Sequence, residues 1–216
     1  MLATLKPDQP HTRQIQGATP EILSGVLEDD INLAIWQRQL PAHIEDFSAL
    51  LLSMNQPLAE SITLNVKAGE VEPNLRGLAA GYTDLLGYEG FIADLSWLVS
   101  AYACLLGAES VGLRLRALDK AMCPRFHVDH VPMRLITTYA GVGSQWLEEG
   151  AIDRKRLGQA DAEPQDSLCI RQIERGDVAL LKGERWRGNE GRGLVHRSPQ
   201  LADNERRLIL TLDWLA

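Results

Sequence analysis

Cysteine is scarce in this sequence, which limits the metal sites and cross-links that it can form. The 216 residues include three cysteines, Cys104, Cys123 and Cys169, and no two of them have the short C-x-x-C spacing of zinc-binding and redox motifs. Three cysteines cannot all pair within one chain, so a reducing setting is indicated and we expect a cytoplasmic protein. Cys104 lies in an apolar predicted helix, and we expect it in that helix's core.

Positive charge is also in short supply. The chain has 22 Lys and Arg against 29 Asp and Glu, which gives a net charge of −7 at pH 7. A protein that binds nucleic acid or an anionic membrane needs a basic face that displaces counterions. We therefore expect no nucleic-acid or membrane partner. We expect the partner to be a small-molecule or protein substrate instead, whose identity the sequence does not give.

Long apolar runs and nucleotide-binding motifs are missing as well. The N-terminal MLATLKPDQPHTRQ has no apolar stretch behind its charges, so it does not resemble a signal peptide. The most apolar segment, 91–106, contains Asp94 and is shorter than the roughly 20 residues that cross a bilayer, so we expect a buried helix. No G-x-S-x-G motif, P-loop or G-x-G-x-x-G loop follows a predicted strand.

What the sequence does contain divides into two parts of different texture. Residues 1–109 are expected to be mainly helical, with one short strand at 61–68 and helices starting at Pro20 and covering 44–55, 72–87 and 89–107. Residues 110–216 are expected to form short strands at 111–118, 134–139, 177–181 and 207–214, with a polar loop over 150–168. Successive strands without intervening helices favour an antiparallel sandwich or barrel. No Gly/Ser/Pro-rich linker separates the parts, so we expect one compact α+β unit.

One stretch, CPRFHVDHVP at 123–132, concentrates residues that bind metals. In an extended chain His127 and Asp129 point to the same side, whereas His130 points to the other. An imidazole and a carboxylate suit Fe(II), Mn(II) or Zn(II), but two ligands do not complete a site. Taken alone, this pair is better interpreted as part of a surface turn.

His196 offers the missing ligand, just ahead of the last predicted strand. A set of two histidines and one carboxylate is the facial triad of non-haem Fe(II) oxygenases, and it leaves coordination positions open. Arg206 and Arg207 follow at the start of the last strand, and a buried guanidinium there could bind the distal carboxylate of a cosubstrate. Neighbouring residues on a strand point to opposite faces, so only one of the two can point inward.

The order of these features resembles the double-stranded β-helix, a cupin- or jelly-roll-like fold, of the 2-oxoglutarate/Fe(II)-dependent dioxygenases. FHVDHVPMRLITTYAG is similar to their first metal-binding segment, IERGDVALLKG to the strand before the second metal-binding histidine, and GLVHRSPQLADNERRLILTLDW to the closing segment. More closely, CPRFHVDHVPMRLITTYAGVGSQWL together with ERRLILTLDWL resembles the bacterial domain of unknown function 1826 family. Members of that family tend to be linked with zinc homeostasis and have no established reaction. The resemblance covers about residues 110–216 and implies a C-terminal double-stranded β-helix, on which we expect the helical N-terminal portion to pack.

The resemblance implies that His127, Asp129 and His196 bind the metal. A rival interpretation is a zinc-binding protein of the same fold that serves zinc homeostasis without oxygenase activity, using Cys123 or His130 as an additional ligand. A third interpretation is a cupin-like zinc enzyme that catalyses hydrolysis or isomerisation. Soft thiolates are unusual on an oxygenase iron, so we expect Cys123 near the site but not on the metal.

The resemblance also implies residues for a cosubstrate. Arg207 best matches the clamp for 2-oxoglutarate, with Arg206 as the alternative, and Tyr139 could add a hydroxyl to the carboxylate of the cosubstrate. The oxygenase pattern often has Ser or Thr two residues after the clamp, where this sequence has Ile209. That departure weakens the cosubstrate assignment more than the metal assignment. The expected function is an Fe(II)- and 2-oxoglutarate-dependent oxygenase, a hydroxylase of unknown substrate.

Overall fold

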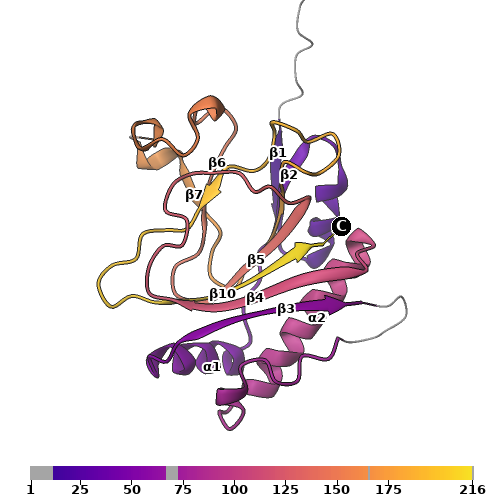
Figure 1. The fold of residues 1–216 in the computed structure, drawn as a ribbon, viewed down its shortest axis with the longest axis vertical. Coiled ribbons are helices and arrows are strands. Elements are labelled where there is room, and N and C mark those ends of the chain that lie inside the picture. The colour runs from indigo at the N-terminus through magenta and orange to yellow at the C-terminus, as the bar shows by residue number, and fades with distance from the viewer. Residues whose placement is uncertain (1–11, 67–72, 165, 216) are drawn as a thin grey trace, which may run out of the picture.

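Two β-sheets and a layer of helices make up the computed structural model, which describes residues 12–66, 73–164 and 166–215 (Figure 1). Residues 1–11, the start of the segment judged not to be a signal peptide, lie outside the described residues. The large sheet has the strand order β1-β2-β8-β5-β10-β4-β3, and the small sheet has the order β7-β6-β9. β1 and β2 are parallel, and all other neighbouring strands in these sheets are antiparallel.

The large sheet draws strands from both parts of the chain. Its members are β1 (Arg13–Gly17), β2 (Ile31–Trp36), β3 (Leu58–Asn65), β4 (Ser110–Leu118), β5 (Met133–Ala140), β8 (Val178–Lys182) and β10 (Arg207–Trp214). The members of the small sheet are β6 (Gln145–Leu147), β7 (Ile170–Gln172) and β9 (His196–Arg197).

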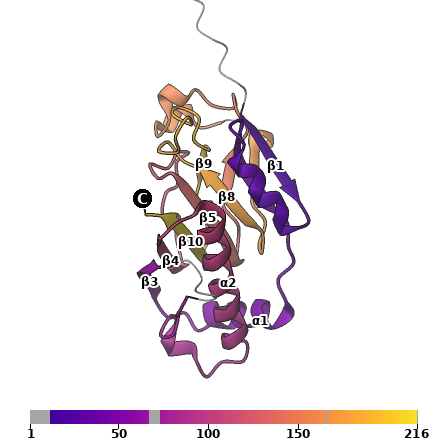
Figure 2. The same ribbon diagram turned by 90° about the vertical axis from the view of Figure 1, so that its right-hand side faces the viewer.

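Two α-helices, α1 (Ala42–Ser53) and α2 (Tyr88–Leu106), lie against the large sheet (Figures 1 and 2). Short 3-10 helices are η1 (Pro20–Leu27), η2 (Ala80–Tyr82), η3 (Arg154–Arg156), η4 (Ala160–Ala162) and η5 (Ser167–Cys169). In α1 the buried side chains of Ile44, Phe47 and Leu51 recur at helical spacing, which is why this segment packs one face on the sheet.

Successive residues of the large sheet face two different cores, because side chains alternate along a strand. On β10 one set faces the helices and the other faces the small sheet: Leu208, Leu210 and Leu212 against Arg207, Ile209, Thr211 and Asp213. Between the sheets, Ile136 and Ile209 pack in one apolar cluster with Trp146 of β6. The polar members of the inward set are therefore available to build a site between the sheets.

The expected packing of a helical N-terminal portion on a separate C-terminal β-fold is not confirmed. Segments before residue 66 supply β1, β2 and β3, which occupy both edges of the large sheet. β2 escaped notice because INLAIW is almost entirely buried and so lacks the alternation of a half-exposed strand. Most of 72–87 forms turns and η2 rather than a long helix, and the backbone there includes Gly77 at φ 94° and Ala79 at φ 51°.

Other expectations for this part are confirmed. Helices do form over most of 44–55 and 89–107, and a strand covers most of 61–68, of which residues 67 and 68 are outside the described part. The helix after Thr19 begins at Pro20 as predicted, although it is of the 3-10 type. β3 pairs with β4 along its whole length. The expected boundary near residue 109 therefore falls between two paired strands of one sheet.

α2 is the one helix among the described residues that is long and apolar enough to cross a membrane by length and composition alone. In the structure Leu95, Leu98, Val99 and Tyr102 are buried in the core that the helix shares with the large sheet, as expected of a buried helix. This packing accounts for its apolar character. The expectation that Cys104 lies in the core is wrong, because its side chain is exposed on the outer face of the helix.

Packing of α2 on the sheet should contribute strongly to stability. Leu95→Ala should lower the free energy of unfolding by about 2–5 kcal/mol, because Leu95 is 0% exposed and its truncation leaves a cavity. The same substitution at Leu86, which is 89% exposed, should change it by less than about 0.5 kcal/mol. Urea denaturation followed by circular dichroism measures both values, and equal effects would contradict the packing described.

Candidate metal centre

The two candidate metal-binding histidines are held side by side by the backbone. His127 and His196 form an isolated antiparallel β-bridge, in which the N–H of each donates to the carbonyl oxygen of the other at 3.0 and 2.9 Å. Side chains directly opposite each other in such a pair project to the same side. Their ring centroids lie 4.6 Å apart. Residues almost 70 positions apart in the sequence therefore present two imidazoles at one point.

Asp129 completes this cluster. The Nε2 of His196 lies 3.3 Å from Asp129 Oδ2, and the Nε2 of His127 lies 3.9 Å from Asp129 Oδ1. One ligand atom from each residue can be chosen so that all lie within 4.8 Å of one another. Two atoms bound at about 2.1 Å to one ion lie roughly 3.0–3.4 Å apart at octahedral or tetrahedral angles. The three groups need only a small inward adjustment to share an ion.

Both imidazoles present the nitrogen that a metal needs. The Nδ1 of His127 lies 3.0 Å from the carbonyl oxygen of Arg125, and the Nδ1 of His196 lies 3.1 Å from that of Leu194. A carbonyl oxygen only accepts, so each Nδ1 carries the proton and donates it. In the neutral ring Nε2 then has a free lone pair, which faces Asp129.

Asp129 is itself fixed by a chain of ionic contacts. Arg134 on β5 donates from Nη1 to Asp129 Oδ1 at 2.7 Å, and from Nε and Nη2 to both oxygens of Asp213 on β10 at 2.6 and 3.1 Å. Arg114 on β4 also pairs with Asp213, which is only 2% exposed. Asp129 Oδ2 is buried and accepts no hydrogen bond among the described residues. One carboxylate oxygen is therefore oriented by Arg134, and the other is left for a metal.

Gly183 allows the segment that carries Asp129 to approach the end of β8. Its N–H donates to the carbonyl oxygen of Pro132 at 3.0 Å, and the next N–H, of Glu184, donates to that of Asp129 at 2.9 Å. A Cβ at position 183 would collide with the carbonyl oxygen of Val131. Only glycine fits this approach without a shift of the metal-site backbone.

The charges around the site favour its metal-binding protonation states. Burial lowers the pKa of His127, and the neighbouring His196 lowers it further, so the His127 ring is neutral at pH 7. Burial alone would raise the pKa of Asp129, but His196, Arg134 and His127 outweigh it and hold that pKa far below its usual value. A metal at this point would therefore displace no proton from His127 or Asp129 near neutral pH.

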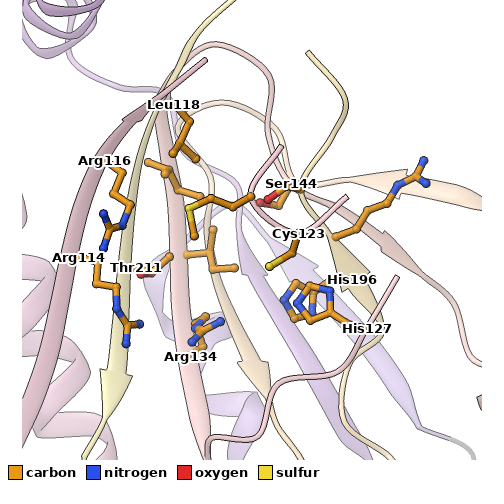
Figure 3. Close-up of a pocket in the computed structure, with 14 residues that line it drawn as sticks. Arg114, Arg116, Leu118, Cys123, His127, Arg134, Ser144, His196 and Thr211 are labelled. Atoms are coloured by element: carbon orange, nitrogen blue, oxygen red, sulfur yellow. The ribbon is translucent and has the colours of Figure 1, made fainter. Parts of the chain in front are cut away.

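A cavity of about 290 Å³ opens between the sheets beside the histidines. Figure 3 shows Arg114 and Arg116 on one side of it and His127 and His196 on the other. Apolar side chains cover much of its wall, namely Leu118, Met122, Ile136 and Ile209. A small molecule in this cavity would lie next to a bound metal.

Arg207 is buried on the same inward face of the large sheet. Its side chain is 1% exposed, and only Nη2 has partners, the hydroxyls of Thr138 at 3.1 Å and of Ser144 at 3.0 Å. Nε and Nη1 have no hydrogen-bond partner among the described residues. Burial lowers the pKa of Arg207 to about 10, and no carboxylate in the described chain offsets this effect. Ser144 also lines the cavity, so the guanidinium lies just behind the cavity wall.

Gly141 brings the end of β5 against this arginine. It has φ +82°, and a Cβ there would meet the backbone of Arg206 and Arg207. Arg206 points the other way, and its Nη1 and Nη2 donate to the carbonyl oxygens of Leu52 and Gln56 at 3.2 and 3.1 Å. Of the two candidate arginines, Arg207 is the one that faces the interior between the sheets.

Tyr139 is not placed to contact a cosubstrate in the cavity, and that prediction is corrected. Its side chain is 0% exposed, its hydroxyl donates to Asp94 Oδ2 on α2 at 2.5 Å, and its ring packs on Phe91. Tyr139 is an odd number of residues from Arg134, so it faces the helices while Arg134 faces the metal site. The contacts with the site are made instead by Arg134 and its partner Asp213. Neither residue was predicted from the sequence.

Cys123 and His130 are outside the cluster of candidate ligands that the described residues form. The thiol of Cys123 lines the cavity near the two histidines (Figure 3), and all three cysteines are free. His130 is exposed, as the alternation predicted.

A family model for proteins of unknown function, DUF1826, matches residues 17–213. The chain belongs to the DUF1826 family. No curated protein matches this DUF1826 chain. Among solved structures, a Shewanella oneidensis protein provisionally named an oxygenase superposes with a TM-score of 0.51 at 11% identity, over 94% of this chain and 89% of that one. This likeness shows a shared fold.

Two further structures of oxygenases align with the DUF1826 chain less well. The dioxygenase for auxin oxidation 1 of Arabidopsis thaliana, solved with 2-oxoglutarate, has a TM-score of 0.48 at 10% identity, over 95% of this chain and 92% of that one. A prolyl-4-hydroxylase of Pseudomonas putida has a TM-score of 0.45 at 11% identity, over 90% of this chain and 96% of that one.

Loss of the Arg134 contact should weaken metal binding. Arg134→Gln frees Asp129 from its orienting partner, and we expect affinity for Co(II) to fall roughly 10- to 100-fold. Competition with a chromophoric chelator at pH 7 measures the affinity, and near-UV circular dichroism checks the fold. Arg175→Gln is the control, since Arg175 is exposed and its one ion pair within the described part of the chain is with Glu45. Equal affinities for the two variants would show that Asp129 needs no such support.

Proposed function

We propose that this DUF1826 protein is a non-haem Fe(II)- and 2-oxoglutarate-dependent oxygenase that hydroxylates a substrate. His127, Asp129 and His196 would bind the iron, and Arg207 would bind the distal carboxylate of 2-oxoglutarate. The fold shared with a protein provisionally named an oxygenase supports this proposal but does not carry it, because folds host many functions.

The buried guanidinium of Arg207 is the observation that carries the proposal. A buried cation is normally paired, because removal from water is costly without a partner. Arg207 has two hydroxyl partners and no carboxylate among the described residues, and its Nε and Nη1 are free. A dicarboxylate cosubstrate would supply the missing anion. Thr138 and Ser144 would hold Nη2 and so orient the guanidinium.

The donor set of the metal site fits the same function. Two imidazoles and one carboxylate suit Fe(II) and leave part of its coordination sphere open. When bound, Fe(II) with 2-oxoglutarate supplies the activation of O₂ that couples oxidative decarboxylation of the keto acid to hydroxylation. The chain's own contribution is to orient the three ligands through two backbone carbonyls and Arg134, and to keep His127 neutral.

Zinc is the alternative that the experiment must separate. The thiol of Cys123 lines the cavity, and a thiolate favours Zn(II) over Fe(II). A zinc-binding protein of zinc homeostasis, without oxygenase activity, would use this thiol. Cys123 is outside the cluster that the three candidate ligands form, so the oxygenase is the proposal that we favour.

Anaerobic titration tests the proposal directly. Protein loaded with Fe(II) should develop a weak visible charge-transfer band when 2-oxoglutarate is added, and should form succinate when air is admitted. If no band and no succinate appear, while Zn(II) binds tightly and is lost in Cys123→Ser, the protein is a zinc-binding protein and the oxygenase proposal fails.

Arg207→Met separates cosubstrate binding from stability. Removal of a buried, unpaired cation should leave the free energy of unfolding within about 1 kcal/mol of wild type or raise it. The variant should nevertheless lose the charge-transfer band and the increase in melting temperature that 2-oxoglutarate gives to the Fe(II)-loaded protein. Arg206→Met is the matched control and should retain both. Loss of stability without loss of 2-oxoglutarate binding would assign Arg207 a purely structural role.

A further inference from the structure

The cavity beside the metal centre has an unusual charge for a protein of net charge −7. Among the described residues four arginines line it, and no aspartate or glutamate does: Arg114, Arg116, Arg134 and Arg197. A cavity with this lining attracts anions, provided that its arginines are not already neutralised by carboxylates behind the wall.

Three of the four arginines are neutralised in this way. Arg114 and Arg134 share the buried carboxylate of Asp213, and Arg134 also contacts Asp129. Arg197 pairs with Glu163 at 2.8 Å, and its guanidinium lies over the ring of Phe126. A carboxylate offsets the charge of each of these groups, so each attracts a further anion less than an unpaired arginine would.

Arg116 differs from them. It has no carboxylate partner among the described residues, and its one hydrogen bond there runs from Nη2 to the hydroxyl of Ser61 at 3.1 Å. Its Nε is buried and has no partner in the part of the chain that the structure describes. Figure 3 shows its side chain across the cavity from His127 and His196. This Nε lacks the hydrogen bond to water that a solvated arginine makes, and a ligand in the cavity would supply one.

We propose that the cavity binds a substrate that carries an oxyanion, a carboxylate or a phosphate, and that Arg116 binds this group. The fork that matches the two oxygens of such a group is Nε with Nη2, the pair with which Arg134 binds Asp213, and Nη2 has a second N–H for the hydroxyl of Ser61. Leu118, Ile136 and Ile209 line the same cavity and would contact an apolar body. The ligand class is therefore a small amphipathic anion. Its role as substrate rests on the proposed oxygenase function, whereas the anion binding does not.

Binding of simple anions to the metal-free protein tests the proposal, because no metal can then hold the anion. The probes are benzoate and phenyl phosphate, and benzamide is the neutral match for benzoate. In protein labelled with ¹⁵N-arginine, the Nε–Hε peak of Arg116 is the one that disappears in Arg116→Gln. Benzoate or phenyl phosphate should shift this peak saturably, and benzamide should not.

Variants decide whether Arg116 is the cause. Calorimetry should show at least about tenfold weaker anion binding in Arg116→Gln, since a charge-assisted pair of hydrogen bonds is lost. Arg116→Lys should bind with intermediate affinity, because it keeps the charge and loses the fork. Arg171→Gln, at an exposed arginine on β7, should bind as wild type does. Equal binding of benzamide, or unchanged affinity in Arg116→Gln, overturns the proposal.

The oxygenase proposal fails or holds separately, in the charge-transfer titration with 2-oxoglutarate. Anion binding without the band would leave an anion-binding cavity in a protein that is no oxygenase. The band without anion binding at Arg116 would leave an oxygenase whose substrate is not anionic.

Discussion

The two-residue period of the large sheet is the constraint on which both the core and the site depend. On β10 each leucine that faces the helices is followed by a residue that faces the small sheet. The first set anchors α1 and α2, and the second set supplies Arg207, Ile209, Thr211 and Asp213 to the interior between the sheets. A shift of register by one residue would place these polar groups under the helices and the leucines in the cavity. Alternate positions of one strand therefore supply the packing of the core and the side chains of the candidate site.

Charge within this interior is balanced at one end and unbalanced at the other. Near the candidate metal ligands, Asp213 accepts hydrogen bonds from Arg114 and Arg134, and Arg134 also donates one to Asp129. At the opposite end of β10, Arg207 has hydroxyl partners and no carboxylate among the described residues. A buried ion network holds its members in one geometry, whereas an unpaired buried cation reduces stability and persists for another reason. The balanced end fits a rigid scaffold for a metal, and the unbalanced end fits a site for an anion.

Much of the site could be predicted from the sequence, and the reasons are local. His127 and Asp129 share a side because they are two residues apart, and alternation also placed His130 outside. The same argument, applied to β5, would have excluded Tyr139, because it faces opposite to Arg134. Tyr139 was predicted from the resemblance of an ordered set of motifs, whereas the alternation of side chains along the strand argues against it. Alternation likewise predicted that Arg206 and Arg207 point to opposite faces of the strand. Only the three-dimensional structure shows which one is buried.

Other parts of the fold could not be predicted from the sequence in this way. Five of the six residues of β2 are apolar, and no periodicity distinguishes such a short segment from part of a buried helix. β1 pairs with β2 in parallel, and β9 is two residues long, so neither has a local pattern of its own. Asp213 was not singled out from the sequence. Its role depends on Arg114 and Arg134, whose proximity follows from the strand order β5-β10-β4 rather than from sequence spacing.

Ile209 is the residue where the sequence departs from the oxygenase pattern, and the structure changes the meaning of that departure. The hydroxyls near Arg207 come from Thr138 on β5 and from Ser144 after it, so a hydroxyl at position 209 is not needed to orient the guanidinium. On β10, Ile209 follows Arg207 on the same face and lies opposite Arg116 of β4. If Arg207 binds the cosubstrate and Arg116 the substrate, an apolar side chain lies between the two anionic groups. Ile209 neighbours both arginines on this face and offers neither anion a hydrogen bond, whereas a serine or threonine at this position would offer one to either.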